Sequence, residues 1–137
     1  MIMYESTNRR ASKVSFSQAL LEGQAPDGGL YTPDTIPSIT LQELKEMRGL
    51  PYPDVAFKIA WKYLYEELPE DDLKSIIEGA YDFTAPLTHV HNRTYLMRLD
   101  QGPTAAFKDF AAQMMSRLMQ YYLKKMGRDM LVLTATS

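Results

Sequence analysis

The stretch QGPTAAFKDFAAQMM, residues 101–115, marks the point where extended segments give way to a long helix. Gly-Pro-Thr at residues 102–104 is a turn sequence, and Thr104 is a favourable N-cap for the apolar pattern that follows. The pattern recurs at helical spacing to about Met126, and Gly127 is a natural residue to end it. The sequence therefore predicts a long amphipathic helix that begins at Thr104.

Extended segments flank this helix on both sides. Upstream, two short strands around Leu87–Val90 and Tyr95–Leu99 are joined by a turn at Asn92-Arg93. Downstream, Met130–Leu133 is a continuous apolar run of the kind that forms a buried parallel strand. Strand, helix and strand make a βαβ unit, so we expect an α/β fold in which a parallel sheet begins here. Ligand loops begin where such strands end, so we expect the chain to be a piece of a longer protein.

The preceding part of the chain is mainly helical. Ser15, Thr40 and Asp54 are expected to cap three of its helices, and Pro69 begins a fourth. The four predicted helices lie within KVSFSQALLEG (13–23), TLQELKEMRGL (40–50), DVAFKIAWKYLYEEL (54–68) and PEDDLKSIIEGAY (69–81). We therefore expect a small, mainly helical N-terminal domain over residues 1–85. Residues 86–137 would then be the incomplete beginning of a parallel-sheet catalytic domain.

Composition limits the classes of protein that remain. The 137 residues include 15 Lys and Arg against 17 Asp and Glu, which is not the basic balance of a nucleic-acid-binding protein. The sequence has no apolar run of the about 18 residues that a membrane span requires, and its first residues lack the apolar core of a signal peptide. It has no cysteine, which excludes disulfides, thiolate metal sites and a cysteine nucleophile. We expect a cytoplasmic protein that binds neither nucleic acid nor membrane.

Several patterns have a simple structural interpretation. His89 and His91 would share one face of a strand and could bind a metal, but without a neighbouring carboxylate they are better interpreted as surface residues. The acidic residues at positions 66–72 are typical of a helix junction, where they favour capping and solvation over acid–base chemistry. An apolar series on the long helix predicts core packing: Met114, Met115, Leu118, Met119 and Tyr122.

Lys108 is the candidate catalytic residue. With Thr104 as N-cap, it would occupy about the fourth position of the helix, where the helix dipole disfavours an ammonium group. An amine that is more easily neutral is a better nucleophile toward a carbonyl group. An ordinary exposed lysine on a helix is the simpler interpretation, and physical reasoning alone leaves both open.

A family resemblance separates these interpretations. GPTAAFKDF, residues 102–110, closely resembles the motif in which threonine synthases carry their pyridoxal-phosphate lysine. KVSFSQALLEGQAPDGGLYTP, residues 13–33, is similar to the N-terminal signature of that family, and the opening Tyr4-Glu5-Ser6-Thr7 also fits. The closing LTATS resembles the start of the family's Ala-Thr-Ser-Gly-Asp-Thr-Gly loop. The resemblance covers essentially the whole chain, in order, and corresponds to about the first third of such an enzyme.

The resemblance implies a pyridoxal-phosphate enzyme of fold type II, similar to the β subunit of tryptophan synthase. Such an enzyme converts O-phospho-L-homoserine and water to L-threonine and phosphate. By position, Lys108 would bind pyridoxal 5'-phosphate covalently and then move protons at the substrate carbons. Phe107 would form part of the wall of the cofactor pocket, and Thr136 and Ser137 would bind the substrate carboxylate.

The chain also departs from the family pattern. Asp100-Gln101 stands where relatives often carry Phe-His, and Ala105 where leucine is frequent. Two alternatives remain: another fold-type-II lyase such as a threonine dehydratase or cysteine synthase, against which the APDGGLY stretch argues, and a non-catalytic module similar to threonine synthase. These 137 residues alone are expected to be inactive, because they include no phosphate-binding loop.

Overall fold

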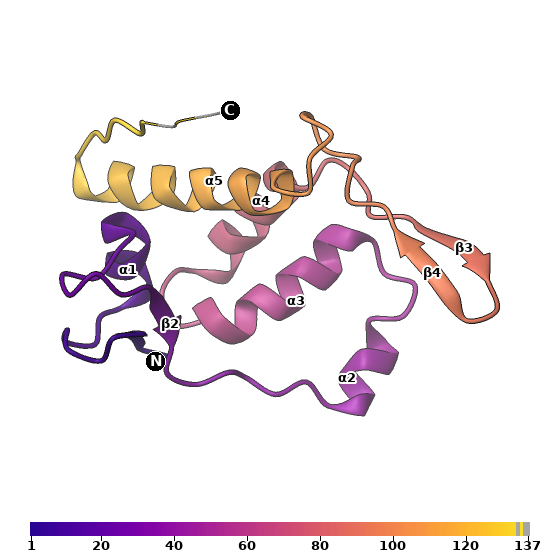
Figure 1. The fold of residues 1–137 in the computed structure, drawn as a ribbon, viewed down its shortest axis with the longest axis horizontal. Coiled ribbons are helices and arrows are strands. Elements are labelled where there is room, and N and C mark those ends of the chain that lie inside the picture. Colours follow the sequence, from indigo (N-terminus) through magenta and orange to yellow (C-terminus); the bar gives the residue numbers. More distant parts are fainter. Residues whose placement is uncertain (134, 136–137) are drawn as a thin grey trace.

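The computed structural model describes residues 1–133 and residue 135. Five helices and two strand pairs follow one another along these residues, and α5 lies across the helices that precede it (Figure 1). In chain order the elements are β1 (Tyr4–Ser6), α1 (Phe16–Glu22), β2 (Tyr31–Pro33), α2 (Leu41–Glu46), α3 (Tyr52–Leu64), α4 (Glu70–Ala80), β3 (Leu87–His91), β4 (Thr94–Met97) and α5 (Asp109–Met126).

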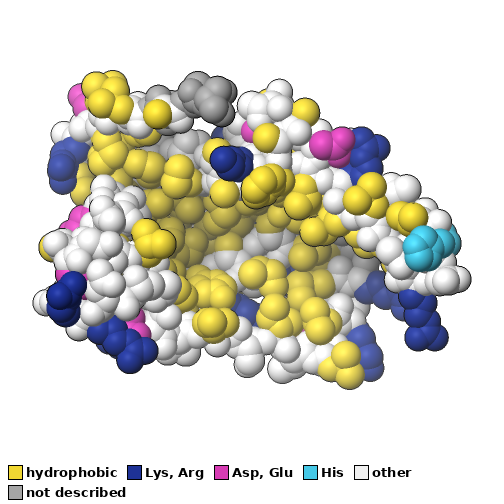
Figure 2. Space-filling model, viewed as in Figure 1, with side chains coloured by type: hydrophobic (Ala, Val, Ile, Leu, Met, Phe, Trp, Pro, Cys, Tyr) yellow, Lys and Arg dark blue, Asp and Glu magenta, His cyan; other side chains and the backbone are white. Residues whose placement is uncertain are grey.

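The core forms where α3, α4 and α5 meet. On α4, Leu73, Ile77 and Ala80 recur at helical spacing and are all at most 1% exposed. Leu118 of α5 joins them in one cluster with the end of α3. In the space-filling view, apolar side chains gather in the hollow between these helices (Figure 2). Helix α5 therefore packs on the N-terminal helices, which fixes the position of the turn that precedes it.

Among helices α1 to α4, the predicted starts agree with the structure, with one exception. Ser15 accepts a hydrogen bond from the Gln18 backbone at the start of α1. Thr40 and Glu43 form a reciprocal capping box at the start of α2. The third helix does not begin at Asp54 as expected: it begins at Tyr52, directly after Pro51, and has no side-chain cap. Prolines are favoured in a first helical turn because their missing N–H has no partner there anyway, so the pair Pro51 and Pro53 starts the helix earlier.

The N-terminal signature folds as one unit around Asp27. The chain turns at residues 26–29, with Gly28 at φ 79°. This turn returns the chain so that β2 pairs antiparallel with β1. The Asp27 carboxylate accepts hydrogen bonds from the Ser6 hydroxyl at 2.6 Å and from the backbone N–H of Arg10 at 2.9 Å. The signature is therefore a compact structural motif that brings the first strand onto α1.

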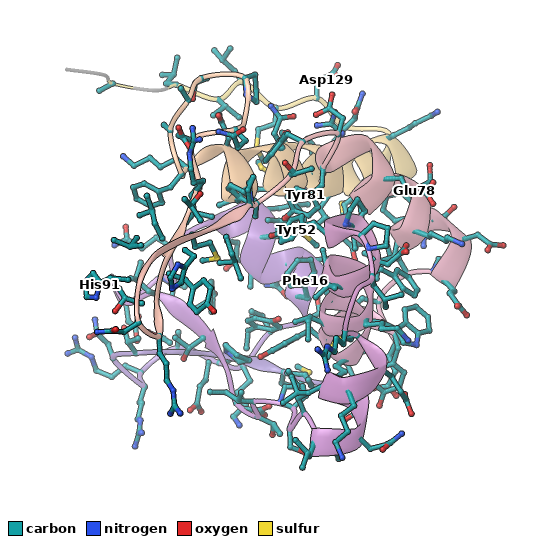
Figure 3. All side chains as sticks on the ribbon, turned by 90° about the vertical axis from the view of Figure 1, so that its right-hand side faces the viewer. Phe16, Tyr52, Glu78, Tyr81, His91 and Asp129 are labelled. Atoms are coloured by element: carbon teal, nitrogen blue, oxygen red, sulfur yellow. The ribbon has the colours of Figure 1, made fainter. Side chains whose placement is uncertain are left out.

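The predicted hairpin is confirmed. Strands β3 and β4 pair antiparallel around the turn at Asn92, whose φ is 48°. Every residue of both strands is exposed, and the hairpin extends away from the helices (Figure 1). His91 lies far out on this hairpin (Figure 3).

The strand expected at Met130–Leu133 is not formed. These residues have no regular secondary structure, and Leu131 and Leu133 are 84% and 85% exposed. Within the described residues both strand pairs are antiparallel, so the expected parallel sheet and βαβ unit are absent there. A strand needs a hydrogen-bonding neighbour, and β3 and β4 already pair with each other. The mixture of helix and strand expected for an α/β fold is present.

Candidate active site

Lys108 stands directly before α5 rather than within it. Its backbone is helical (φ −62°, ψ −20°), it occupies the N-cap position, and its side chain is exposed. The expected placement in the fourth helical position, with Thr104 as the cap, is therefore wrong. Residues 102–108 form a succession of turns, in which Ala105 has a φ of 55° that no helix contains.

The buried carboxylate of Asp109 holds these turns in place. Asp109 is 5% exposed, and one of its oxygens accepts the backbone N–H of Thr104 at 2.9 Å. The other oxygen accepts the Thr104 hydroxyl at 2.8 Å. Gly102 lies against the same side chain, since a Cβ at Gly102 would come within 2.5 Å of the carboxylate. Asp109 thus connects the turn to α5. Its position after Lys108 is the only sequence feature that points to this role.

Phe107 lies next to Lys108 and faces the end of the hairpin. Its side chain is 65% exposed and lines, with residues 96–100, an open hollow of about 340 Å³. Arg98 donates to both carboxylate oxygens of Asp100 on the rim of this hollow, at 3.1 and 2.7 Å. The Arg98 guanidinium, followed by the Gln101 amide, holds the pKa of Asp100 well below its usual range. Of the residues in place of the family's Phe-His pair, Asp100 is therefore engaged in a local ion pair, and Gln101 donates a hydrogen bond to it.

The Lys108 amine is available for chemistry. Among the described residues it is in neither an ion pair nor a hydrogen bond, whereas Lys13, Lys62 and Arg98 all pair with carboxylates. A cofactor that carries an aldehyde requires an accessible primary amine of this kind. The residues present therefore fit one attachment point for pyridoxal phosphate. Thr136 and Ser137, predicted to bind the substrate carboxylate, lie outside the described residues.

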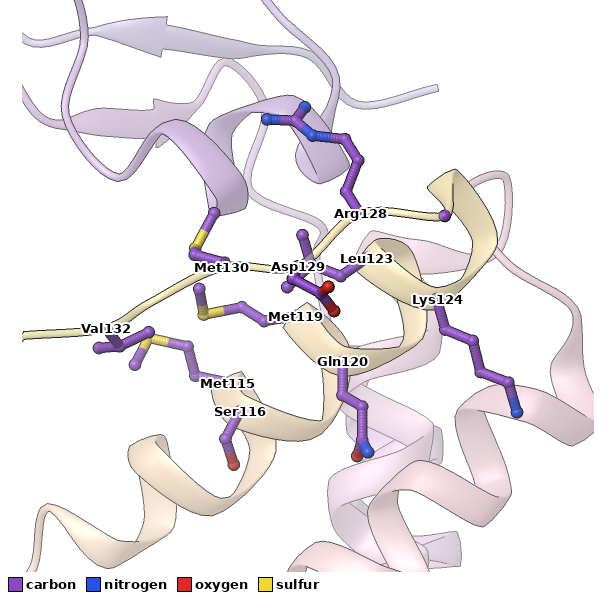
Figure 4. A pocket seen from close by; sticks show the side chains of 11 residues that line it. Met115, Ser116, Met119, Gln120, Leu123, Lys124, Arg128, Asp129, Met130 and Val132 are labelled. Carbon is purple, nitrogen blue, oxygen red and sulfur yellow. The ribbon is translucent and has the colours of Figure 1, made fainter.

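A larger hollow lies elsewhere on α5. A groove of about 720 Å³ runs between α5 and the segment that follows it, and it includes neither Phe107 nor Lys108 (Figure 4). Met115 and Met119 line this groove, and Met115 is 48% exposed. The expectation that both pack in the core is therefore wrong, although Leu118 and Tyr122 are buried as predicted.

The two histidines of the hairpin are surface residues. Both are exposed, and His89 Nε2 lies 2.8 Å from the carbonyl oxygen of Asn92. Within residues 1–133 and 135, no cluster of three or more His, Asp or Glu side chains is arranged to hold a metal ion. None of the helices described there is long and apolar enough to cross a membrane.

Comparison with known proteins identifies the family. The family model described as Threonine synthase N terminus matches residues 3–81, more than half of the chain. The threonine synthase of Pseudomonas aeruginosa is 38% identical over 139 residues, which cover 98% of this chain and 30% of that protein. The chain therefore belongs to the threonine synthase family and spans about a third of the length of such relatives.

Solved structures of the family have the same fold. A threonine synthase from Brucella melitensis with bound PLP superimposes with a TM-score of 0.88 and 35% identity, over 93% of this chain and 28% of that one. The threonine synthase of Escherichia coli superimposes with a TM-score of 0.81 and 29% identity, over 87% of this chain and 28% of that one. The similarity extends over both the N-terminal helices and the region around α5.

Proposed function

We propose that this chain is the N-terminal part of a threonine synthase, which converts O-phospho-L-homoserine and water to L-threonine and phosphate. The observation that carries the proposal is the similarity to a PLP-bound threonine synthase over 93% of the chain. The side chain of Lys108, in the motif GPTAAFKDF, is exposed. Residues 1–85 would form the N-terminal domain, and residues 86–137 the beginning of the catalytic domain.

Lys108 is the catalytic residue of this proposal. Its amine is accessible and unpaired among the described residues, so it can attach pyridoxal 5'-phosphate. When bound, the cofactor supplies an electron sink that makes the α and β carbons of the substrate acidic. The same amine would accept and return protons at these carbons.

Two other elements support Lys108. The exposed ring of Phe107 offers an apolar surface beside the amine, which would limit the access of water to the cofactor. Thr136 and Ser137 would bind the substrate carboxylate through hydroxyl and backbone N–H groups, a role that rests on the family resemblance of LTATS. Catalysis further requires the phosphate-binding part of the family fold, so the 137 residues alone are expected to be inactive.

Product analysis on the full-length protein tests the proposal. Incubation with O-phospho-L-homoserine and pyridoxal 5'-phosphate is expected to release L-threonine and phosphate in equal amounts. Phosphate without threonine would indicate another lyase of the same cofactor class. A folded protein that binds the cofactor and releases neither product would support the non-catalytic alternative and overturn the proposal.

The attachment site is tested separately by trapping. Borohydride reduction of the holoenzyme, digestion and mass spectrometry are expected to place the pyridoxyl group on Lys108. A label found on Lys124, Lys125 or another lysine would show that the site assignment is wrong.

A further inference from the structure

The turn before α5 has two possible conformations, and the structure selects one of them. Its sequence is compatible with a helix that begins at Thr104, as the N-cap preference of threonine predicts. The structure instead begins α5 at Asp109 and keeps residues 102–108 in turns. In the first arrangement Lys108 would project from the side of a helix, whereas in the second it stands at the helix end.

The contacts of Asp109 explain the selection. Its two oxygens accept hydrogen bonds from the backbone N–H and the hydroxyl of Thr104. In a helix that began at Thr104, Asp109 would lie about 7.5 Å further along the axis, too far to accept these bonds. The bonds close a loop over residues 104–109, and Lys108 lies within that loop. Gly102 packs against the same carboxylate, so a side chain at position 102 would collide with it.

Because Asp109 is buried, its hydrogen bonds to Thr104 are needed to offset the cost of burying its charge. Asp109 is 5% exposed, and a buried carboxylate is costly unless hydrogen bonds and favourable charge compensate for it. Thr104 supplies the hydrogen bonds, and the N-terminal end of α5 supplies partial positive charge. No described residue forms a salt bridge with Asp109, so its compensation depends on the turn having this conformation.

We propose that Asp109 is the positioning residue for Lys108: by holding Thr104 it prevents α5 from extending backwards, and so presents the Lys108 amine at the end of the helix. This inference rests on the proposed function of Lys108. Asp109 acts through the backbone, because both of its oxygens are engaged by Thr104.

The test uses the full-length protein in three variants. Asp109→Ala removes the link, and Asp109→Asn keeps one acceptor oxygen for Thr104. Asp72→Ala is the matched control, since the Asp72 carboxylate accepts the Tyr121 hydroxyl at 3.0 Å and joins α4 to α5 without touching the turn. Each apoprotein is mixed with limiting pyridoxal 5'-phosphate and quenched with borohydride at intervals. Peptide mapping then gives the labelling rate of Lys108 relative to Lys124 in the same sample.

We expect Asp109→Ala to lower the relative labelling rate of Lys108 by between about tenfold and about a hundredfold, as misplacement by about 1 Å can do. Asp109→Asn should recover most of the rate, and Asp72→Ala should match the wild type. In the loaded enzyme, Asp109→Ala should lower kcat and leave KM nearly unchanged. Hydrogen exchange should show faster exchange at the Thr104 amide in Asp109→Ala only.

The outcomes separate the two proposals. A wild-type protein that is not labelled at Lys108 contradicts the proposed function. Labelling at Lys108 that is equally fast in the wild type and Asp109→Ala, or equally slowed in Asp72→Ala, overturns the positioning role alone. If Asp109→Ala does not fold, Thr104→Val decides, because it removes the hydroxyl bond and keeps the backbone bond. It should slow Lys108 labelling to a smaller degree, and an unchanged rate would overturn the inference.

Discussion

Glu67 caps a helix that lies 51 residues away from it in the sequence. Its carboxylate accepts a hydrogen bond from the backbone N–H of Phe16, the first residue of α1, at 3.0 Å. The contact joins the junction between α3 and α4 to the N-terminal signature. It also places a negative charge at the N-terminal end of α1, where the helix dipole favours it.

Loss of this cap should destabilise the protein. Glu67→Ala is expected to lower the free energy of unfolding by about 1 kcal/mol, the usual effect of losing an N-terminal cap. Glu67→Gln keeps an acceptor oxygen and should cost less. Urea unfolding of the full-length protein measures both. Glu78→Ala, at an exposed site on α4, is the control and should change stability by less than about 0.5 kcal/mol. Equal effects at positions 67 and 78 would show that the cap contributes nothing.

Two buried tyrosines should respond in opposite directions to loss of their hydroxyl groups. Tyr81 donates to the carbonyl oxygen of Phe110 at 3.0 Å, whereas the Tyr122 hydroxyl has no hydrogen-bond partner among the described residues. Burial raises the pKa of both phenols, that of Tyr81 to about 12. Because an unsatisfied buried hydroxyl costs free energy, Tyr122→Phe should stabilise the protein by about 1 kcal/mol, and Tyr81→Phe should destabilise it by about 1 kcal/mol. Chemical unfolding of both variants measures the difference. A Tyr122→Phe variant that is as destabilised as Tyr81→Phe would mean that the hydroxyl has a partner.

Acid should weaken the N-terminal signature at Asp27. The Ser6 hydroxyl, with the backbone N–H groups of Gly29, Arg10 and Ala11, lowers the pKa of Asp27 from 3.8 to about 2. A lowered folded-state pKa contributes stability that is present above pH 3.8 and is lost as the pH falls towards about 2. Asp27→Asn should therefore be less stable than the wild type at neutral pH, and the difference should shrink over that interval. Urea midpoints measured along the pH series provide the check, and a difference that is independent of pH would contradict the prediction.

Local signals in the sequence were sufficient for much of the fold. Ser15 and Thr40 cap their helices because a short polar side chain directly before a helix can accept a hydrogen bond from a free backbone N–H of the first turn. The turn at residues 26–29 follows from glycine at a position with positive φ, and the hairpin from alternating residues around Asn92. In each of these cases the residues that decide the structure are close together in the chain.

Three of the errors share a physical cause, because each depended on a contact that the local pattern does not specify. Met130–Leu133 has the composition of a strand, but it has no neighbouring strand among the described residues. Met115 fits the helical spacing of apolar residues, but this spacing does not show whether a residue faces the core or an open groove. Met115 lines the groove beside α5. At the candidate site, Lys108 was found from a family motif, whereas the start of α5 was misplaced because Asp109 reaches back to Thr104.

Lys108 should be indispensable for turnover in the full-length protein. Attachment of the cofactor requires a primary amine, and the proton transfers proposed at the substrate carbons require the same amine to return. Lys108→Ala should abolish threonine formation. Lys108→Arg should do so as well, because a guanidinium keeps the charge but stays protonated and cannot form an imine. Both variants should keep the fold, because the Lys108 side chain is exposed and its replacement removes few packing contacts. Activity assays, circular dichroism and urea unfolding measure the two effects.

Lys124 provides the matched control at the opposite end of α5. It is exposed in the last turn of α5, where a positive charge is favoured by the helix dipole. Lys124→Ala should therefore cost about 0.3 kcal/mol of stability and leave turnover unchanged. The two lysines lie at opposite ends of α5, and both are exposed. Activity that survives in Lys108→Ala, or is lost in Lys124→Ala, would assign the chemistry to a different residue.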